Sequence, residues 1–284
     1  MAKIEIPCSY QGGKSRLAKD IVDIFFKQND IDENTMFYDL CCGSGAITIE
    51  LINRGVKPKQ IIMLDKSSWG KFWNSIGKGI FNLTKFEKYI NRIPQEKDLI
   101  KDYMLNLSKQ NASIDEEYVY LLLQASSFGS KQIWKENNVW CNTSFRSYWQ
   151  PTETSSRRSP VNPMMPMPDT LLQRVRHVKE KCFGLTCFNS DIYDILNFNI
   201  EDENAIIYID PPYKTTTKYG FVFDINDFVE KLNRKTSISI YLSEGYKFSD
   251  NAICLSSGRS KGGISGSRNK KANEEWLNIF NKLN

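Results

Sequence analysis

The stretch MFYDLCCGSGAITIELIN, residues 36–53, decides the fold of this chain. Its apolar run at 36–40 predicts a short buried strand. Gly43 and Gly45 end that strand before an apolar helical segment at 46–53, which Gly55 can cap. A second apolar run at 60–65 ends in an acid, Asp65. Strand, glycine-rich turn, helix and strand form a βαβ unit, whose right-handed crossover predicts a parallel, doubly wound α/β sheet.

The same reading places the other elements. A loop at 10–13 precedes apolar residues at helical spacing from 17 to 25, and further strands are expected at 185–189, 205–210 and 237–243. Trp276, Leu277, Phe280 and Leu283 predict a closing amphipathic helix. Residues 82–176 change to helical segments, notably 116–128, and then to a loop. We therefore expect an inserted domain at 82–176 between two parts of the main domain, 1–81 and 177–284.

Composition excludes several classes of protein. With 284 residues, 40% of them apolar, the chain is expected to be ordered, and its formal charge of +5 permits nucleic acid as a partner. No apolar stretch approaches the ~20 residues of a membrane helix and no secretory leader is present, so we expect a cytoplasmic protein. Seven cysteines, an odd number with an adjacent pair, predict free thiols. A single histidine, His177, and the lack of a C-x-x-C pair predict no metal site.

Two familiar nucleotide motifs fail on inspection. Gly13-Lys14-Ser15 suggests a phosphate-binding loop, but Cys8 stands where the first glycine of that motif belongs and no apolar strand precedes it. The dinucleotide pattern G-x-G-x-x-G also fails, because Thr48 stands at its last position. Nucleotide triphosphate hydrolysis and ordinary NAD binding are therefore disfavoured.

The turn after the first strand retains the features of a nucleoside site. Asp39 lies near the end of the strand, and Gly43 and Gly45 would let a ligand approach backbone N–H groups at a helix start. Asp65 follows Gly45 by 20 residues, where an acid can accept both ribose hydroxyls. An uncharged turn beside an acid suits a cationic ligand such as S-adenosylmethionine better than a pyrophosphate. The alternative is that either acid merely caps a helix or forms an ion pair.

The most specific motif is Asp210-Pro211-Pro212-Tyr213, directly after a predicted strand. Two prolines end the strand and fix the direction of the backbone carbonyls. If Asp210 and the Pro211 carbonyl accept both protons of an adenine amine, its nitrogen can direct a lone pair at a methyl sulfonium. Tyr213 could stack on a base rotated out of the duplex. The alternative is an ordinary proline turn.

Two basic segments are candidates for DNA contact. Residues 134–168 interleave aromatic and basic side chains, and residues 258–271 are basic and contain no acid. In the first segment the aromatic residues could instead pack on the main domain, and the second could be a solvated surface. We expect base-edge contacts from Asn142, Ser144, Arg146 and Tyr148, and phosphate contacts from Arg157, Arg158, Arg259, Lys261, Arg268 and Lys270.

The chain resembles the DNA adenine-N6 methyltransferases of the Dam-like D12 class, especially its phage-type members. The resemblance rests on Tyr10-Gln-Gly-Gly-Lys14, Asp39-Leu-Cys-Cys-Gly-Ser-Gly45, Asp65 and Asp210-Pro-Pro-Tyr213, in the family's order. It implies a Rossmann-like, S-adenosylmethionine-dependent methyltransferase sheet with an inserted, mainly helical target-recognition domain. It also implies site-specific methylation of double-stranded DNA. No obligatory protein partner is inferred, so we expect a monomer, and the oligomeric state on DNA is left open.

The resemblance also implies roles for individual residues. Tyr10 would flank S-adenosylmethionine, Lys14 and Asp39 would help to hold it, and Asp65 would bind its ribose. Asp191 would contact the adenine of the cofactor, and Asp210 would lie between cofactor and flipped base. The chain departs from the family's pattern at Cys41, where an aromatic residue is common, and at Tyr10, where some relatives have tryptophan.

Several alternatives remain open at this point. Cytosine N4 methylation uses the same chemistry, although Asp rather than Ser at 210 favours adenine by resemblance. Cytosine C5 methylation needs a cysteine nucleophile, and Pro7-Cys8 lies in the wrong context for it. The chain could also be a non-catalytic DNA-binding protein on a methyltransferase fold, or could methylate RNA or a protein amide. The recognised DNA sequence is left open.

Overall fold

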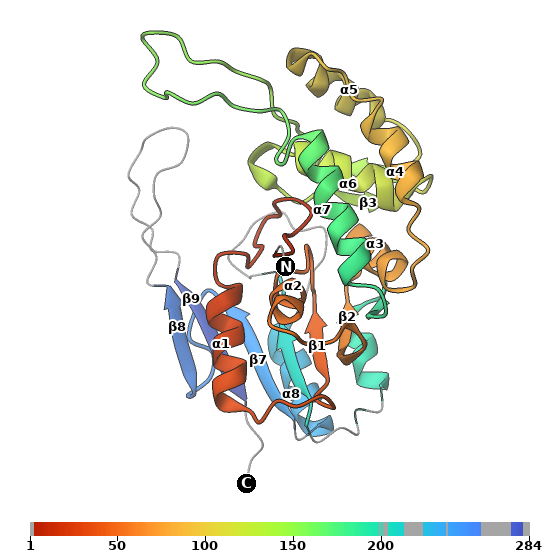
Figure 1. Ribbon diagram of the computed structural model, residues 1–284. Coiled ribbons are helices and arrows are strands. Elements are labelled where there is room, and N and C mark those ends of the chain that lie inside the picture. Colours follow the sequence, from red (N-terminus) through yellow and green to blue (C-terminus); the bar gives the residue numbers. More distant parts are fainter. Residues whose placement is uncertain are drawn as a thin grey trace.

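The computed structural model describes residues 3–198, 200, 204–212, 224–236, 238–256 and 274–280. A seven-stranded sheet with helices on both faces forms the lower part of the molecule in Figure 1, and a mainly helical part covers the end of the sheet to which β1 and β2 point. No helix among these residues has the length and apolar character needed to span a bilayer.

The strands of the main sheet are short, as expected for a buried parallel core. They are β1 (Phe37–Leu40), β2 (Ile61–Leu64), β5 (Thr186–Phe188), β6 (Ile206–Ile209), β7 (Ser239–Glu244), β8 (Ala252–Ser256) and β9 (Glu275–Phe280). A separate hairpin is formed by β3 (Trp134–Glu136) and β4 (Val139–Cys141).

The helices fall on the sheet or in the covering part. They are α1 (Ala18–Gln28), α2 (Ala46–Asn53), α3 (Ser68–Gly77), α4 (Leu83–Ile90), α5 (Ile100–Leu107), α6 (Glu116–Ser126), α7 (Pro168–Lys181) and α8 (Ile225–Lys235). Short 3-10 helices are η1 (Pro58–Gln60), η2 (Lys97–Leu99), η3 (Phe128–Ser130) and η4 (Ile192–Asn197).

The strand order is β5-β2-β1-β6-β7-β9-β8. The β5, β2, β1, β6 and β7 strands pair in parallel, whereas β9 runs antiparallel between β7 and β8. The chain order therefore reverses between β1 and β6, and in such sheets the ligand crevice lies outside the carboxyl ends of the strands at this point. The predicted doubly wound α/β architecture with a mostly parallel sheet is confirmed.

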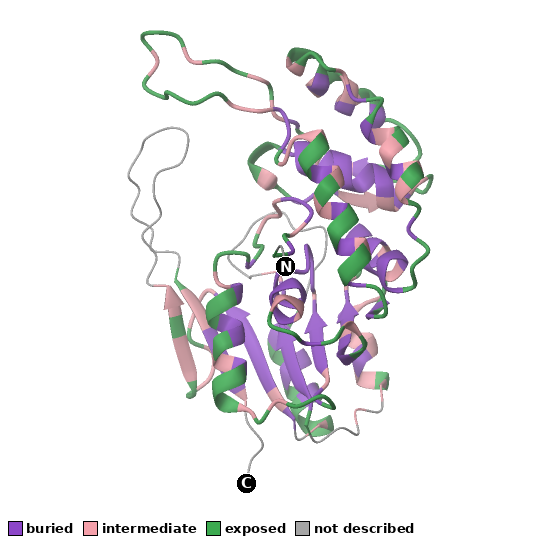
Figure 2. Cartoon of the chain, in the orientation of Figure 1, coloured by how far each residue is buried: buried purple, intermediate pink, exposed green. Residues whose placement is uncertain are grey.

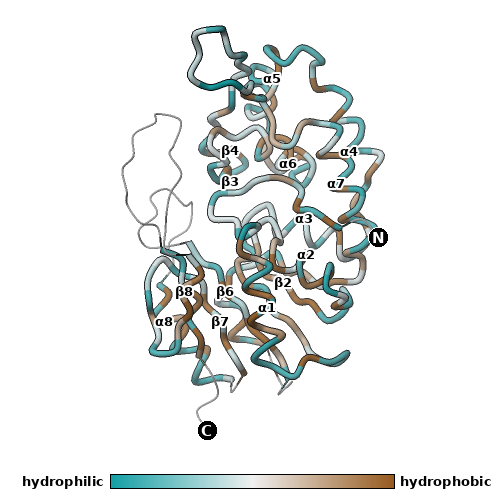
Figure 3. Tube along the Cα trace, turned by 60° about the vertical axis from the view of Figure 1, so that its left-hand side comes forward, coloured by the Kyte–Doolittle hydropathy of each residue, from teal (hydrophilic) through white to brown (hydrophobic). Residues whose placement is uncertain are grey.

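The central strands β1 and β6 are buried on both faces, which explains the uninterrupted apolar runs in the sequence. Along β6, Ile206 and Tyr208 join the cluster that includes α1 and the covering helices, whereas Ile207 and Ile209 join the cluster under α8 and η4. Figure 2 shows the central strands as buried, and Figure 3 shows them as hydrophobic beside the hydrophilic outer side of α8.

The predicted helix at the end of the chain is wrong, because residues 275–280 form β9. Leu277 and Ile279 join the cluster on the α1 face of the sheet, whereas Phe280 packs against the cluster under α8, which is the period of a strand. The same residues also fit a helical spacing over one turn, so the sequence pattern could not separate the two. The unpaired edges of β7 and β8 accept a strand at this place, and their hydrogen bonds decide the outcome.

The part that covers the sheet contains η2, α4 to α7 and the hairpin. Its buried residues, such as Ile100 and Leu122, belong to the same hydrophobic cluster as Met63 of the sheet, so the core is continuous. The predicted boundary between 176 and 177 falls inside α7, which packs against both α3 and α4. The residues from 142 to 167 form a long loop that extends from the body in Figure 1.

Candidate active site

A pocket of about 380 Å³ lies at the carboxyl ends of β1, β2 and β6. This volume is within the range of about 300–1,000 Å³ typical of small-molecule sites. The predicted site residues that line it are Tyr10, Lys14, Asp39, Gly43, Asp65, Asp191, Asp210, Pro211 and Pro212. Gly45 does not line the pocket, and Tyr213 lies outside the described residues. Segments far apart in the sequence are therefore brought together as the motifs predict.

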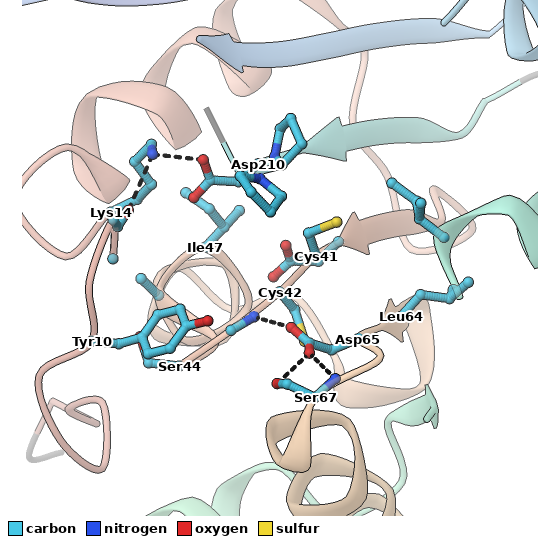
Figure 4. Close-up of a pocket in the computed structure, with 18 of the residues that line it drawn as sticks. Tyr10, Lys14, Cys41, Cys42, Ser44, Ile47, Leu64, Asp65, Ser67 and Asp210 are labelled. Atoms are coloured by element: carbon cyan, nitrogen blue, oxygen red, sulfur yellow. Dashed lines mark hydrogen bonds and ion pairs between the residues drawn. The ribbon is translucent and has the colours of Figure 1, made fainter. Parts of the chain in front are cut away.

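Asp65 is held rigidly at the end of β2. Its Oδ2 accepts the backbone N–H of Gly43 at 2.7 Å, and its Oδ1 accepts the backbone N–H and the hydroxyl of Ser67 at 2.8 and 2.6 Å (Figure 4). Burial raises the pKa of Asp65, although these bonds oppose the shift. Ser67 was not foreseen from the sequence, but a serine two residues after an acid is a common local pattern of this kind.

Asp39 connects β1 to the following helix. Its Oδ2 accepts the Thr48 hydroxyl at 2.7 Å and the Thr48 backbone N–H at 3.3 Å. Burial raises the pKa of Asp39 to about 7, in spite of these hydrogen bonds. Asp39 therefore fixes the start of α2 beside the pocket as well as lining it.

Asp210 forms an ion pair with Lys14, 196 positions earlier in the chain. The Lys14 Nζ lies 2.6 Å from Asp210 Oδ1, and it also donates to the Gly12 carbonyl at 3.1 Å (Figure 4). Burial raises the pKa of Asp210 to about 6, and Lys14 opposes this shift. No described residue makes a hydrogen bond to Oδ2 of Asp210, so this oxygen retains its capacity as an acceptor at the pocket.

Gly43 packs directly beneath the N-terminal loop. A Cβ atom at this position would lie 3.0 Å from the Tyr10 ring, and the backbone has a φ of +50°. The Tyr10 ring in turn meets Trp69 edge to face at a centroid distance of 5.9 Å. The glycine therefore makes room for Tyr10, and its N–H is already donated to Asp65.

Gly45 precedes α2 as its N-cap residue and leaves room for the buried indole ring of Trp73. A Cβ atom here would lie 2.3 Å from the Trp73 ring, and φ is +73°. The N–H of Gly45 donates to the Cys42 carbonyl at 2.8 Å. The N–H groups of both glycines are therefore already paired, that of Gly43 with Asp65 and that of Gly45 with the Cys42 carbonyl. The approach of a ligand to the N–H groups at the start of α2 stays a prediction.

Asp191 caps η4 and pairs with a surface lysine. Its Oδ1 accepts the backbone N–H of Tyr193 at 3.1 Å, and its Oδ2 lies 2.8 Å from Lys66 Nζ. Burial alone would raise the pKa of Asp191, but the ion pair with Lys66 outweighs this effect and lowers it. Asp191 and Lys66 both line the pocket.

Gln132, from the covering part, lines the pocket without any signal in the sequence. Its backbone N–H donates to Gln11 Oε1 at 3.3 Å. The Gln132 Oε1 atom and the Ser44 Oγ atom are buried and have no hydrogen-bond partner among the described residues. Buried polar atoms of this kind are rare, and a bound polar ligand is one way to satisfy them.

Two of the residues expected to read bases anchor the long loop to the end of α6. Arg146 donates from Nε to the Ser127 carbonyl and from Nη2 to the Ser130 hydroxyl, each at 2.9 Å. Asn142 donates to the Gln132 carbonyl at 2.6 Å. These contacts place the start of the loop beside the pocket.

The other candidates for DNA contact within the described residues lie on the loop itself. Ser144 is exposed, and the Tyr148 ring has the Lys97 ammonium 5.2 Å from its centroid. Arg157 and Arg158 are exposed and donate to carbonyls of their own loop, Ser159 at 2.8 Å and Glu153 at 3.2 Å. Arg259, Lys261, Arg268 and Lys270 lie outside the described residues.

Cys8 and the two cysteines that line the pocket, Cys41 and Cys42, are poor nucleophiles. All seven are free thiols. Burial raises the pKa of the Cys8 thiol to about 12, so no thiolate is available there near neutral pH. Burial also raises the pKa values of Cys41 and Cys42 beside the pocket. A covalent route to a cytosine ring therefore has no support from this site.

The doubly wound sheet, with its pocket at the reversal point and an acid at the end of β2, fits the methyltransferase fold. Residues 10–249 match the model of the D12 class N6 adenine-specific DNA methyltransferase family, and the chain belongs to this family. It is therefore an enzyme that methylates adenine N6 at specific sites in DNA, as the sequence motifs predict. A comparison with curated proteins gives no match.

Proposed function

We propose that the pocket binds S-adenosylmethionine and that Asp210, Pro211 and Pro212 present the amine of a flipped adenine to it. The observation that carries the proposal is the position of Asp210. Its carboxylate lines the same pocket as Asp65, and its Oδ2 retains acceptor capacity. An adenine amine offers two N–H donors, and a carboxylate oxygen and a fixed carbonyl can accept both.

The lining of the pocket fits S-adenosylmethionine, which this family generally uses. Four aspartates and two lysines line the pocket, an excess of two acids, which suits a ligand with a sulfonium and an ammonium group. Tyr10, Lys14, Asp39, Gly43, Asp65 and Asp191 would hold the cofactor, with Gly45 shaping the turn. When bound, the cofactor supplies an electrophilic methyl group.

The residues of the chain supply orientation and charge. A hydrogen bond accepted from the N6 amine lets the adenine nitrogen direct its lone pair out of the ring plane, and the Asp210 carboxylate stabilises the positive charge that develops on nitrogen. The two prolines prevent the Pro211 carbonyl from turning away. Tyr213 is proposed to stack on the base, which must leave the duplex for its amine to reach Asp210.

The predicted insertion, residues 82–176, which makes up most of the covering part, is proposed to be the target-recognition domain. Gln132 supports this role because it connects the covering part to the cofactor pocket. Arg146 and Asn142 fix the loop that carries Ser144, Tyr148, Arg157 and Arg158 toward double-stranded DNA. The basic segment at 258–271 is proposed to contact DNA phosphates. The enzyme is proposed to act as a monomer.

The test is incubation with labelled S-adenosylmethionine and unmethylated genomic DNA, followed by nucleoside analysis and methylation-sensitive sequencing. We expect N6-methyladenine in one sequence context. Asp210→Ala should abolish methylation and leave DNA binding intact, because Asp210 acts in the chemical step. An equal loss of methylation and of DNA binding in Asp210→Ala would contradict the proposed role of Asp210. Detection of N4-methylcytosine in place of N6-methyladenine would contradict adenine as the target base.

A further inference from the structure

A third group shares the ion pair at the proposed catalytic acid. The Lys14 Nζ lies 3.4 Å from Oε1 of Glu275, in addition to its 2.6 Å contact with Asp210 Oδ1. The side chain of Lys14 is only 5% exposed, and those of Asp210 and Glu275 are 17% and 16% exposed. One buried ammonium therefore lies between two largely buried carboxylates that come from different strands.

The antiparallel direction of β9 brings Glu275 to this place. Glu275 is the first residue of β9, and its neighbour Trp276 pairs with Glu244 at the last position of β7. A parallel strand would begin at the opposite edge of the sheet, away from the carboxyl ends of β6 and β7. Glu275 also lies beyond residues 10–249, which match the family model.

The local charge explains what a second carboxylate can do. A buried lysine that pairs with Asp210 alone would neutralise the carboxylate that must accept a hydrogen bond from the adenine amine and, after methyl transfer, its proton. With Glu275 as a second partner, the three groups carry a net charge of −1 when all are ionised. The ammonium is also held on the Oδ1 side of Asp210, away from the acceptor oxygen Oδ2.

We propose that Glu275 is a positioning residue for methyl transfer: it holds the Lys14 ammonium beside Oδ1 of Asp210 and leaves Oδ2 to the adenine amine. This inference rests on the proposed role of Asp210. When the N6 lone pair forms the new bond to the methyl carbon, the electrons of the carbon–sulfur bond remain on sulfur. The positive charge on N6 persists until a proton passes to Asp210, and the net negative charge of the cluster stabilises it.

Other groups also act on the Asp210 carboxyl, and they remain in place when Glu275 changes. Glu244 at the end of β7 is 1% exposed, and burial raises its pKa, with Asp210 and Glu275 contributing to the shift. Within the described part of the chain, the titratable and charged groups that interact with Asp210 are Lys14, Glu275, Glu244, Asp39, Tyr208 and Cys41.

The test measures single-turnover methylation between about pH 5 and pH 9, with cofactor and DNA bound beforehand. Glu275→Gln keeps the shape and an acceptor oxygen but removes the charge. We expect the plateau rate to fall about tenfold, equivalent to about 1.4 kcal/mol on the barrier. The ionised form of Asp210 is the active one, and Glu275 raises its pKa. Removing that charge should therefore shift the acidic limb of the profile about one pH unit lower.

Two further variants make the result specific. Glu275→Asp keeps the charge and should retain the wild-type acidic limb while recovering part of the rate. Glu274→Gln removes a charge from the adjacent exposed residue, whose carboxylate accepts from Trp276 Nε1 at 2.8 Å rather than from Lys14, and it should leave both readouts unchanged. If Glu275→Gln fails to fold, the plateau rate of Glu275→Asp is compared with that of Glu274→Gln. A lower rate in Glu275→Asp alone would support the inference, and equal rates in the two variants would overturn it.

The outcomes separate this inference from the proposed function. Full methylation by Asp210→Asn would overturn the role of Asp210 and, with it, the role of Glu275. Loss of methylation by Asp210→Asn, together with a wild-type limb and plateau in Glu275→Gln, would overturn the role of Glu275 alone. The inference would also be overturned if Glu274→Gln moved the acidic limb of the pH–rate profile as far as Glu275→Gln does. The same holds if Glu275→Asp moved it that far.

Discussion

Replacement of Gly45 by alanine tests whether the turn after β1 is built around Trp73. The added Cβ would lie 2.3 Å from the indole ring, a distance at which the ring or the turn must move. Trp73 also donates from Nε1 to the Gly43 carbonyl at 2.9 Å, so displacing the ring disturbs the part of the turn that holds Asp65. Gly45→Ala should therefore reduce both stability and cofactor binding.

The magnitude has two parts. An alanine in the left-handed region, at φ +73° and ψ +32°, costs roughly 1–2 kcal/mol. Overpacking of a buried aromatic adds roughly 1–3 kcal/mol. We expect the free energy of unfolding to fall by about 2–5 kcal/mol in total, which is a large fraction of the ~5–15 kcal/mol typical of a folded protein.

Gly129 supplies a matched control. Its backbone has φ +66° and ψ +18°, close to that of Gly45, but a Cβ atom there would meet nothing within 4 Å. Gly129→Ala should therefore show only the backbone part, roughly 1–2 kcal/mol. Urea unfolding of both variants and titration calorimetry with S-adenosylmethionine provide the comparison. Equal destabilisation by the two substitutions would refute the steric reasoning, and unchanged cofactor affinity in Gly45→Ala would refute the link to the pocket.

Two further predictions concern stability and DNA binding. The folded carboxyl of Asp39 has a pKa of about 7 against its ordinary value of 3.8, so this group makes the free energy of unfolding decrease as pH rises between these values. Asp39→Asn should remove that dependence, and urea unfolding at about pH 5 and pH 8 should show a larger relative stabilisation at the higher pH; an equal effect at both would contradict the assignment. Arg157→Ala should weaken binding to all DNA sequences alike and reduce the salt slope by about 1, and a change confined to one sequence would instead indicate base contact.

The sequence alone determined the parts of the protein that depend on short-range patterns. The apolar runs and glycine turn at 36–65 specify the first βαβ unit, because strand, turn and helix are each set by neighbouring residues. The acid and two prolines after β6 are recognisable for the same reason. The family resemblance carried by these motifs implied that Asp39, Asp65 and Asp210 act at one site, and the structure places them in one pocket because parallel strands end at one edge of the sheet.

Tertiary structure alone decided features that depend on partners distant in the chain. The residues at 275–280 fit helix and strand equally, and β7 and β8 select the strand. The sequence does not show that Tyr10 packs against Gly43 and Trp73 against Gly45, where a Cβ atom would meet each ring. The Lys14 ammonium reaches Asp210 and Glu275 across most of the chain length. Charge pairing and close packing are set by distances in space, and sequence periodicity contains no information about which distant side chains meet.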